Sequence, residues 1–172
     1  MENLVRQAMQ KNADAFTTLM RNQMQNMYKT ARAILYSDED IADAIQDTIL
    51  TCWEKLSRLE EPMYFRTWMT RILINKCNDI LRAQKKFVLV ENLPETPAPD
   101  LGFSNLEWIQ VLERLKPKDR IVVILYYVEG FKTSEIAQML EMSESTVRGT
   151  LARSREKLAT EYDPEIKEEK SV

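Results

Sequence analysis

The side chains with the most distinctive chemistry lie in TWMTRILINKCNDILR, residues 67–82. On a helix with about 100° of rotation per residue, the apolar residues of this segment share one broad face. The opposite face carries an aromatic ring, two arginines, two amides and a carboxylate: Trp68, Arg71, Asn75, Asn78, Asp79 and Arg82. Arginine binds phosphate, amides hydrogen-bond to base edges, and aromatic rings stack on bases. This face therefore indicates nucleic-acid recognition, since an ordinary solvated face would be dominated by Glu and Lys.

A second set of polar side chains lies in TSEIAQMLEMSESTVRGTLARSREKL, residues 133–158. The apolar spacing, with the small Ala137 where two helices would pack, predicts a helix-turn-helix. In that motif the N-terminal part of the second helix enters the major groove, where Ser, Thr and Arg contact base edges. The predicted DNA-contacting residues, the last three of them placed for phosphates, are Ser145, Thr146, Arg148, Gly149, Thr150, Arg153, Arg155 and Lys157. The alternative is a helical hairpin whose basic face is merely solvated.

Two residues of the predicted turn have specific backbone roles. Ser143 is placed to accept a backbone N–H and cap the second helix. Glu141 stands where this turn usually has Gly, at a position expected to be left-handed. A non-Gly residue there costs roughly 1 kcal/mol, which a folded domain tolerates.

The composition argues against catalysis and against a metal centre. The 172 residues include no His, two Cys and three Gly. The commonest general base, a zinc ligand set and a Gly-rich phosphate loop are therefore missing. Cys52 and Cys77 both fall in apolar helical patterns and are expected to be reduced and buried. We expect a protein that is not an enzyme and that uses no metal, no cofactor and no small-molecule substrate.

The net charge of −3 hides three blocks of like charge. Residues 37–47 carry five acidic side chains and no basic one. Residues 62–86 carry six basic side chains against Asp79, and residues 145–157 carry four against Glu156. One acidic block followed by two basic blocks suits a chain that binds nucleic acid on one side and a different partner on another.

The elements that position these residues are predicted to be helices, because Gly and Pro are scarce and good helix formers are abundant. Apolar spacing predicts helices over about 14–36, 40–56 and 65–84, with Ser37 capping the second of them. It predicts four more helices in the second domain, over 105–115, 118–129, 133–140 and 143–158. ENLPETPAPDLG, residues 91–102, holds three prolines and predicts a linker. The predicted fold is all-α, with a helical bundle over 1–86, a Pro-rich linker over 87–104, a helix-turn-helix domain over 105–160 and a disordered acidic tail over 161–172.

The sequence shows no sign of membrane insertion or export. No apolar run approaches the roughly 18–20 residues that a membrane span needs. The N-terminus lacks the basic-then-apolar pattern of a signal peptide. We therefore expect a cytoplasmic protein.

The order of the motifs resembles that of the extracytoplasmic-function sigma factors, the small two-domain branch of the sigma-70 family. The resemblance rests on four stretches: DIADAIQDTILTCW (40–53), FRTWMTRILINKCNDILR (65–82), RLKPKDRIVVILYYVEGFKTSEIAQML (114–140) and STVRGTLARSREKL (145–158). Each is moderately specific alone, and their order and spacing together are highly specific. The resemblance implies that the bundle is sigma region 2 and that the helix-turn-helix domain is sigma region 4.

The resemblance also implies partners and residue roles. The helix over 40–53 would dock on the β′ clamp helices of core RNA polymerase through Asp43, Gln46, Asp47, Leu50 and Trp53. The helix over 65–82 and the lysines after it would recognise and melt the promoter −10 element through Arg66, Trp68, Arg71, Asn75, Asn78, Arg82, Lys85 and Lys86. The connection 58–63 would help to hold a flipped base, and the helix-turn-helix would bind the −35 element. Regulation by an anti-sigma factor is a further implication.

Several alternatives stay open at this point. The acidic residues of the second helix are compatible with a merely solvated face, and Trp53 suits a core better than an interface. Trp68 fits core packing as well as base contact, and Asn75 fits a cap or a buried amide. Gly149 and Thr150 stand where the family often has Ser-Arg, so no −35 preference is carried over. For the whole chain, the rivals are a stand-alone helix-turn-helix regulator with a helical sensor domain and a sigma-like anti-terminator or RNA binder.

Overall fold

The structure, a computed structural model, describes residues 1–88, 112 and 114–162, with side chains described as far as 84 and 159 in the two long stretches. Helices and turns account for the regular structure of these residues, which include no strand. The chain divides into two compact units, Met1–Asp100 and Leu101–Val172. The prediction of an all-α protein with two helical domains is confirmed.

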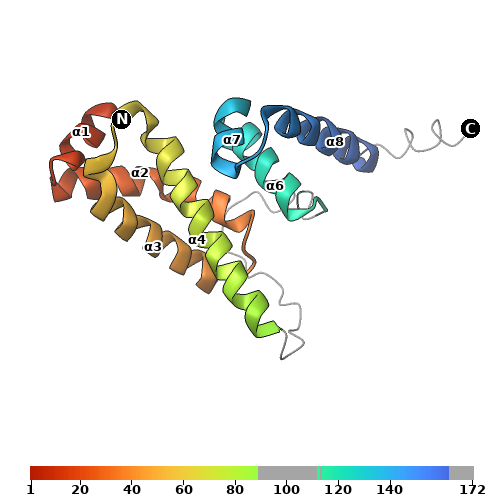
Figure 1. Cartoon of the computed structure of the whole chain (residues 1–172), viewed down its shortest axis with the longest axis horizontal. Coiled ribbons are helices and arrows are strands. Elements are labelled where there is room, and N and C mark those ends of the chain that lie inside the picture. The colour runs from red at the N-terminus through yellow and green to blue at the C-terminus, as the bar shows by residue number, and fades with distance from the viewer. Residues whose placement is uncertain (89–111, 113, 163–172) are drawn as a thin grey trace, which may run out of the picture. The chain divides into compact units, whose positions relative to one another are not determined.

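The first unit is a bundle of four α-helices with two short 3₁₀ turns (Figure 1). Its elements are α1 (Glu2–Met9), α2 (Ala13–Arg32), α3 (Asp38–Lys55), η1 (Leu56–Arg58), η2 (Pro62–Tyr64) and α4 (Phe65–Val88). Helices α2, α3 and α4 pack on one another, and α1 packs on α2 and touches η1 and η2. Asp40 near the start of α3 accepts from Gln84 near the end of α4 at 2.7 Å, and Asp47 in the middle of α3 lies 3.6 Å from Lys76 in the middle of α4. These two helices therefore run antiparallel.

The apolar spacing of the sequence explains the core of this unit. Leu19 and Met27 of α2, Ile41 of α3, and Leu73 and Cys77 of α4 are all at most 1% exposed. Leu73 and Cys77 are four residues apart, and Leu19 and Met27 are eight apart, so each pair lies on one stripe of its helix. These stripes face the neighbouring helices. Burial of such side chains is the main favourable term in folding.

Side-chain caps set the starts of two helices in the bundle. Asn12 Oδ1 accepts from the backbone N–H of Ala15 at 3.0 Å, so α2 begins at Ala13. Ser37 Oγ accepts from the backbone N–H of Asp40 at 3.4 Å, as the sequence predicts for α3. Each cap satisfies one of the N–H groups that the first turn of a helix leaves without a partner.

The second unit contains α6 (Pro117–Val123), the π-helical turn η3 (Ile124–Val128), α7 (Thr133–Leu140) and α8 (Glu144–Tyr162). The sequence predicts one continuous helix over 118–129, but the α-helix ends at Val123. The N–H of Glu129 bonds to the carbonyl of Ile124, five residues back, at 3.0 Å. Gly130 then adopts φ 71° and ends the segment. Figure 1 shows α6, α7 and α8 as successive helices of this unit.

The turn between α7 and α8 has the predicted geometry. Glu141 adopts φ 54° and ψ 45°, which is the left-handed conformation expected for the family's usual glycine. The N–H of Met142 bonds to the carbonyl of Ala137 at 2.9 Å and closes the turn. Leu125, Ile136 and Val147, none of them measurably exposed, form the core beneath it.

Some predicted boundaries shift, and others lie outside the described residues. Helix α4 continues to Val88, past the predicted helix end near residue 84 and the predicted domain end at 86. Helix α8 reaches Tyr162, so it enters the predicted acidic tail. The remainder of the linker over 89–104, most of the predicted helix over 105–115 and the tail over 163–172 lie outside the described residues. Within the described part of the chain, no helix has the length and apolarity to cross a membrane.

Two leucines of the bundle give a test of this packing. Leu73 is 1% exposed and Leu50 is 61% exposed. We expect Leu73→Ala to lower the free energy of unfolding by about 2–5 kcal/mol, because it leaves a cavity in the core. Leu50→Ala should change it by less than about 0.5 kcal/mol, because its side chain is in solvent. Urea unfolding followed by circular dichroism measures both, and equal losses would contradict the assigned orientation of α3.

Candidate nucleic-acid and protein interfaces

Helix α3 exposes one acidic-apolar stripe on the side opposite its core contacts. Asp43, Gln46, Asp47 and Leu50 are all exposed, and their spacing of three, four and seven residues places them on one face. The other face holds the buried Ile41, Ala44, Ile45, Thr48 and Cys52. Leu50 is an exposed large apolar side chain within an acidic surface, a combination that suits a basic partner with an apolar contact.

Asp47 of this stripe also contacts α4. Its Oδ2 lies 3.6 Å from Lys76 Nζ of α4. The Asp47 side chain remains 62% exposed, so this is a surface ion pair. Such pairs contribute little to stability, and exchange for a partner's charge costs little.

Trp53 belongs mainly to the packing of the bundle. Its half-buried ring tilts against Phe16 of α2, with the ring centroids 4.9 Å apart. The Lys11 ammonium lies 4.9 Å from the centroid of the Trp53 ring and donates to the Trp53 carbonyl at 2.7 Å. Lys11 adopts φ 64°, so the turn before α2 is bent to bring this cation to the end of α3. These contacts favour a packing role for Trp53 over an exposed docking role.

Helix α4 presents the Arg/Asn face that the sequence predicts. Arg71, Asn75 and Arg82 are exposed, and Trp68 and Asn78 are half-buried. The exposure of Asn75, in mid-helix, leaves no place for the alternative of a cap or a buried amide. The exposed Arg/Asn face, with Trp68, Arg71, Asn75, Asn78 and Arg82, is the α4 stripe. The Trp68 ring tilts against the buried Phe65 with ring centroids 6.2 Å apart, so Trp68 lies between the α4 stripe and the core.

The remaining charged residues of α4 are placed differently. Asp79 Oδ1 accepts from Arg82 Nη1 at 3.0 Å, so this acid pairs with an arginine of the same helix. Arg66 is half-buried at the start of the helix. Lys85 and Lys86 continue the helix, and their side chains lie outside the described residues.

The structure adds two residues beside this stripe that the sequence analysis did not select. Met63 and Tyr64 in η2 are 64% and 53% exposed, directly before α4. Tyr64 precedes Trp68 by four residues, so the helical spacing of the aromatic residues was a usable signal. Large apolar side chains at this point extend the surface on which bases could stack.

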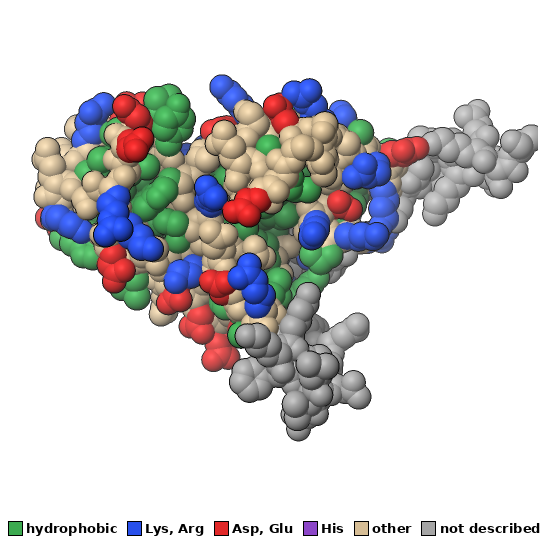
Figure 2. All heavy atoms as spheres, viewed as in Figure 1, with side chains coloured by type: hydrophobic (Ala, Val, Ile, Leu, Met, Phe, Trp, Pro, Cys, Tyr) green, Lys and Arg blue, Asp and Glu red, His purple; other side chains and the backbone are tan. Residues whose placement is uncertain are grey.

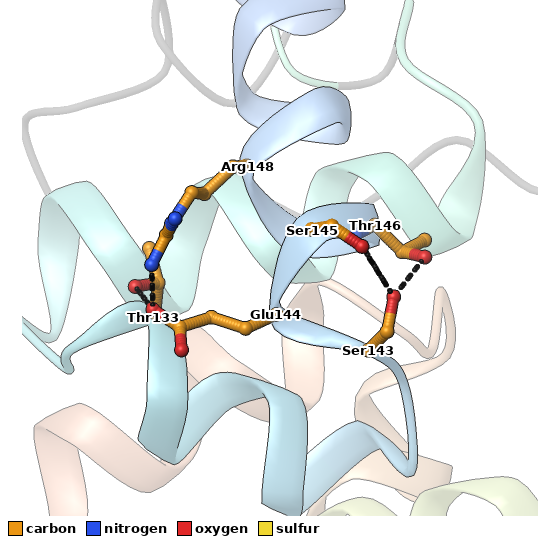
Figure 3. Close-up of polar contacts among 6 residues, drawn as sticks. All are labelled: Thr133, Ser143, Glu144, Ser145, Thr146 and Arg148. Carbon is orange, nitrogen blue, oxygen red and sulfur yellow. Dashed lines mark hydrogen bonds and ion pairs between the residues drawn. The ribbon is translucent and has the colours of Figure 1, made fainter.

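A hydroxyl cluster forms the first turn of α8 (Figure 3). Ser143 Oγ accepts from the backbone N–H of Thr146 at 3.1 Å, which confirms the predicted cap. The same oxygen lies 2.9 Å from Ser145 Oγ and 2.7 Å from Thr146 Oγ1. Ser145 and Thr146 are exposed, so their hydroxyls are both oriented and accessible.

A second group of contacts in this turn involves Glu144, which the sequence analysis did not select. Glu144 Oε1 accepts from Thr133 Oγ1 at 2.6 Å and from Arg148 Nη2 at 2.5 Å (Figure 3). Thr133 and Arg148 both hold the pKa of the Glu144 carboxyl below its ordinary value, and the hydrogen bond from Thr133 is the larger cause. The carboxylate is therefore ionised at neutral pH and joins the starts of α7 and α8 to Arg148.

The burial of Thr150 corrects one of the predicted DNA contacts. Thr150 is 3% exposed, and its Oγ1 accepts from Arg153 Nη2 at 3.2 Å. It follows Val147 by three residues and therefore lies on the buried face of α8, which argues against direct contact with DNA. Its neighbour Gly149 is half-buried, and a Cβ there would lie 3.2 Å from Arg153 Nη1.

The basic residues later in α8 remain on the surface. Arg148, Arg153, Arg155 and Lys157 are exposed. Lys157 Nζ also donates to the carbonyl of Arg114 at 2.6 Å, which ties α8 to the turn before α6. Figure 2 shows several Lys and Arg side chains on the side of this unit where α8 ends. This arrangement suits phosphate contacts beside the base-facing first turn.

Metal binding and thiol chemistry have little support among the described residues. No group of three or more Cys, Asp or Glu side chains in them is arranged to hold a metal ion. Cys52 and Cys77 are fully buried, and burial raises the pKa of both thiols to about 12. At neutral pH both are protonated, so neither is a reactive thiolate.

Comparison with known protein families matches both units. The family described as Sigma-70 region 2 matches residues 12–87, and the one described as Sigma-70, region 4 matches residues 105–158. The RNA polymerase sigma factor NccH of Alcaligenes xylosoxydans xylosoxydans is 31% identical over 170 residues, which cover 91% of each chain. The ECF RNA polymerase sigma factor SigM of Mycobacterium tuberculosis is 29% identical over 148 residues, covering 84% of this chain and 76% of SigM.

The chain belongs to the extracytoplasmic-function sigma factors. Region 2 of this sigma factor thus contains α2, α3 and most of α4, and α1 precedes the match. Region 4 contains α6, η3, α7 and most of α8. The predicted family is therefore confirmed.

Solved sigma-factor structures have the same fold. CnrH, solved in complex with the cytosolic domain of CnrY, aligns with a TM-score of 0.69 and 27% identity over 95% of this chain and 97% of CnrH. The sigma factor RpoE of Bartonella quintana, solved with the anti-sigma factor NepR, aligns with a TM-score of 0.69 and 20% identity over 83% of this chain and 93% of RpoE. The second likeness shows the shared fold alone.

The hydrogen bond between Thr133 and Glu144 can be tested by titration. We expect Thr133→Val to raise the Glu144 pKa toward its ordinary value, because it removes the larger cause of the shift. The stabilisation from this carboxylate is present above its unfolded pKa and is lost as the pH falls through the lower folded value. Carboxyl ¹³C NMR against pH measures the change, with the exposed Thr17→Val as control. An unchanged Glu144 pKa in Thr133→Val would argue that the contact does not form in solution.

Proposed function

We propose that this protein binds core RNA polymerase in the cytoplasm, brings it to particular promoters and helps to open the DNA there, without a catalytic step of its own. The observation that carries the proposal is the exposed Arg/Asn stripe of α4 in a chain that also has a helix-turn-helix. A regulator that only binds duplex DNA needs the helix-turn-helix and does not need the α4 stripe. A factor that also opens DNA needs both, one for the duplex and one for the separated strand.

The α3 stripe is proposed to dock on the β′ clamp helices of core polymerase. Asp43 and Asp47 offer charge to a basic partner, and the exposed Leu50 offers an apolar contact. Complementary charge speeds association and selects the partner, while burial of the leucine strengthens the complex. Trp53 is then a residue that supports the end of α3 from within the bundle, through its contacts with Phe16 and Lys11.

The α4 stripe is proposed to bind the −10 element as it opens. Extrusion of a base costs a few kcal/mol of lost stacking and pairing. Stacking on an aromatic ring and hydrogen bonds from amides to the base edge offset this cost. Trp68, Asn75 and Asn78 supply these groups along one face, and Arg71 and Arg82 are placed for the phosphates.

The first turn of α8 is proposed to bind the −35 element in the major groove. Ser145, Thr146 and Arg148 are exposed there and have base-compatible chemistry. Arg153, Arg155 and Lys157 follow on the same helix and would contact phosphates, while Thr150 is left out because it is buried.

We also propose that a protein of the anti-sigma kind controls this sigma factor. The related CnrH was solved with a second protein, CnrY, bound to it. A partner of this kind could cover the exposed α3 stripe and so exclude core polymerase. Competition between the purified partner and core polymerase for this chain would test the proposal, and simultaneous binding of both would contradict it.

Run-off transcription with purified core polymerase tests the main proposal. We expect this chain to program core polymerase on its own promoter, and Leu50→Asp to lower affinity for core polymerase by at least about tenfold, because a charge replaces the apolar contact. The solvent exposure of Leu50 means that the fold should survive the change, which thermal unfolding checks. If the chain binds promoter DNA yet never programs core polymerase, the stand-alone regulator is the better interpretation.

Variants of the α4 stripe test its role in opening. We expect Asn75→Ala and Arg71→Ala to slow promoter opening by about tenfold or more while leaving core binding intact, because they remove groups that meet the separated strand. Fluorescence of 2-aminopurine in the −10 element measures opening, and a pre-melted template should restore part of the rate. Asn22→Ala, at an exposed amide on α2, is the matched control. Loss of core binding in the α4 variants would assign this face to the polymerase.

A further inference from the structure

A hydrogen-bonded triad of Thr133, Glu144 and Arg148 connects both helices of the helix-turn-helix (Figure 3). Thr133 is the first residue of α7 and Glu144 the first of α8. One carboxylate oxygen of Glu144 accepts from both Thr133 Oγ1, at 2.6 Å, and Arg148 Nη2, at 2.5 Å. The position of the arginine thus depends on a residue of the other helix.

These contacts matter for orientation more than for stability. The side chains of Arg148 and Glu144 are 67% and 38% exposed. Exposed ion pairs at i,i+4 contribute little to folding. An unrestrained arginine has many rotamers, and it loses that freedom when it binds. A guanidinium already held at Nη2 needs to lose less, which favours binding in one orientation.

The arginine keeps enough donors for a base. Guanidinium has five N–H groups, and Glu144 takes one of them from Nη2. The N–H groups left on Nη1 and Nη2 can still form the two parallel bonds to guanine O6 and N7. The adjacent carboxylate also disfavours a phosphate near this site, because like charges repel. This repulsion makes contact of Arg148 with the DNA backbone less favourable than contact with the base edge.

We infer that Glu144, held by Thr133, is a specificity-determining residue that fixes Arg148 for contact with a guanine in the −35 element. This inference rests on the proposed function, in which the first turn of α8 faces promoter DNA. Glu144 acts as a positioning residue, since its effect on the base passes through Arg148. The hydroxyls of Ser145 and Thr146 contact Ser143 instead and take no part in this triad.

Two substitutions probe this triad without changing Arg148 itself. Glu144→Gln keeps the size of the side chain and removes its charge. Thr133→Val keeps the branched shape and removes the hydroxyl that holds Glu144. Glu156→Gln, an exposed acid later on α8, makes the same charge change and serves as the control.

The experiment measures binding of the full chain with core polymerase to promoter duplexes that carry each base pair in turn at every −35 position. Arg148→Ala first identifies the position at which it relaxes a guanine preference. At that position we expect Glu144→Gln and Thr133→Val each to lower the preference roughly three- to tenfold. Glu156→Gln should leave it unchanged. In the Arg148→Ala background, Glu144→Gln should have no further effect on preference.

Several results would overturn the inference and separate its failure from that of the proposed function. A sharper preference in Glu144→Gln would mean that Glu144 competes with DNA for Arg148. Equal changes on all sequences would reduce Glu144 to a charge effect and Thr133 to a phosphate contact. An effect that persists without Arg148 would mean that Glu144 contacts a base itself. If Arg148→Ala relaxes no position, the proposed role of Arg148 fails and the inference falls with it.

Discussion

The packing of α3 against α4 determines where both of their polar faces point. The two helices run antiparallel, with Asp40 meeting Gln84 and Asp47 meeting Lys76. Each buries one apolar stripe in the shared core, and the side-chain positions repeat about every 3.6 residues. Because a helix is rigid, burial of one stripe leaves no freedom in the direction of the opposite one. The acidic stripe of α3 and the Arg/Asn stripe of α4 are thus consequences of the core.

In the second unit, a turn determines the direction in which the exposed polar side chains point. Glu141 in the left-handed conformation brings the start of α8 back to the start of α7, where Glu144 meets Thr133. The buried Val147 and Ile136 set the rotation of the two helices. The exposed part of the first turn then consists of hydroxyls and Arg148, each already held by a neighbour. Both units therefore present polar groups whose positions are determined before any partner arrives.

The sequence predicts the features that depend on local spacing. The helical class, the caps at Ser37 and Ser143, the left-handed Glu141 and the exposure of the α4 stripe all follow from patterns within a few turns of chain. The burial of Thr150 also follows from local spacing, since Thr150 lies three residues after the buried Val147 on the same face of α8. Contacts between distant residues could not be predicted. Lys11 meets Trp53 across 42 positions, and Thr133 meets Glu144 across 11 positions and a turn.

The π-helical turn before α7 has a consequence for chain length. Its i→i+5 bond between Ile124 and Glu129 accommodates one residue more than an α-helical turn would hold. Removal of any one residue from this turn would let the α-helix continue, and all that follows would be rotated by about 100° relative to α6. The helix-turn-helix would then present a different side to the core. The number of residues in this turn, as much as their identity, determines which face of α8 is turned outward.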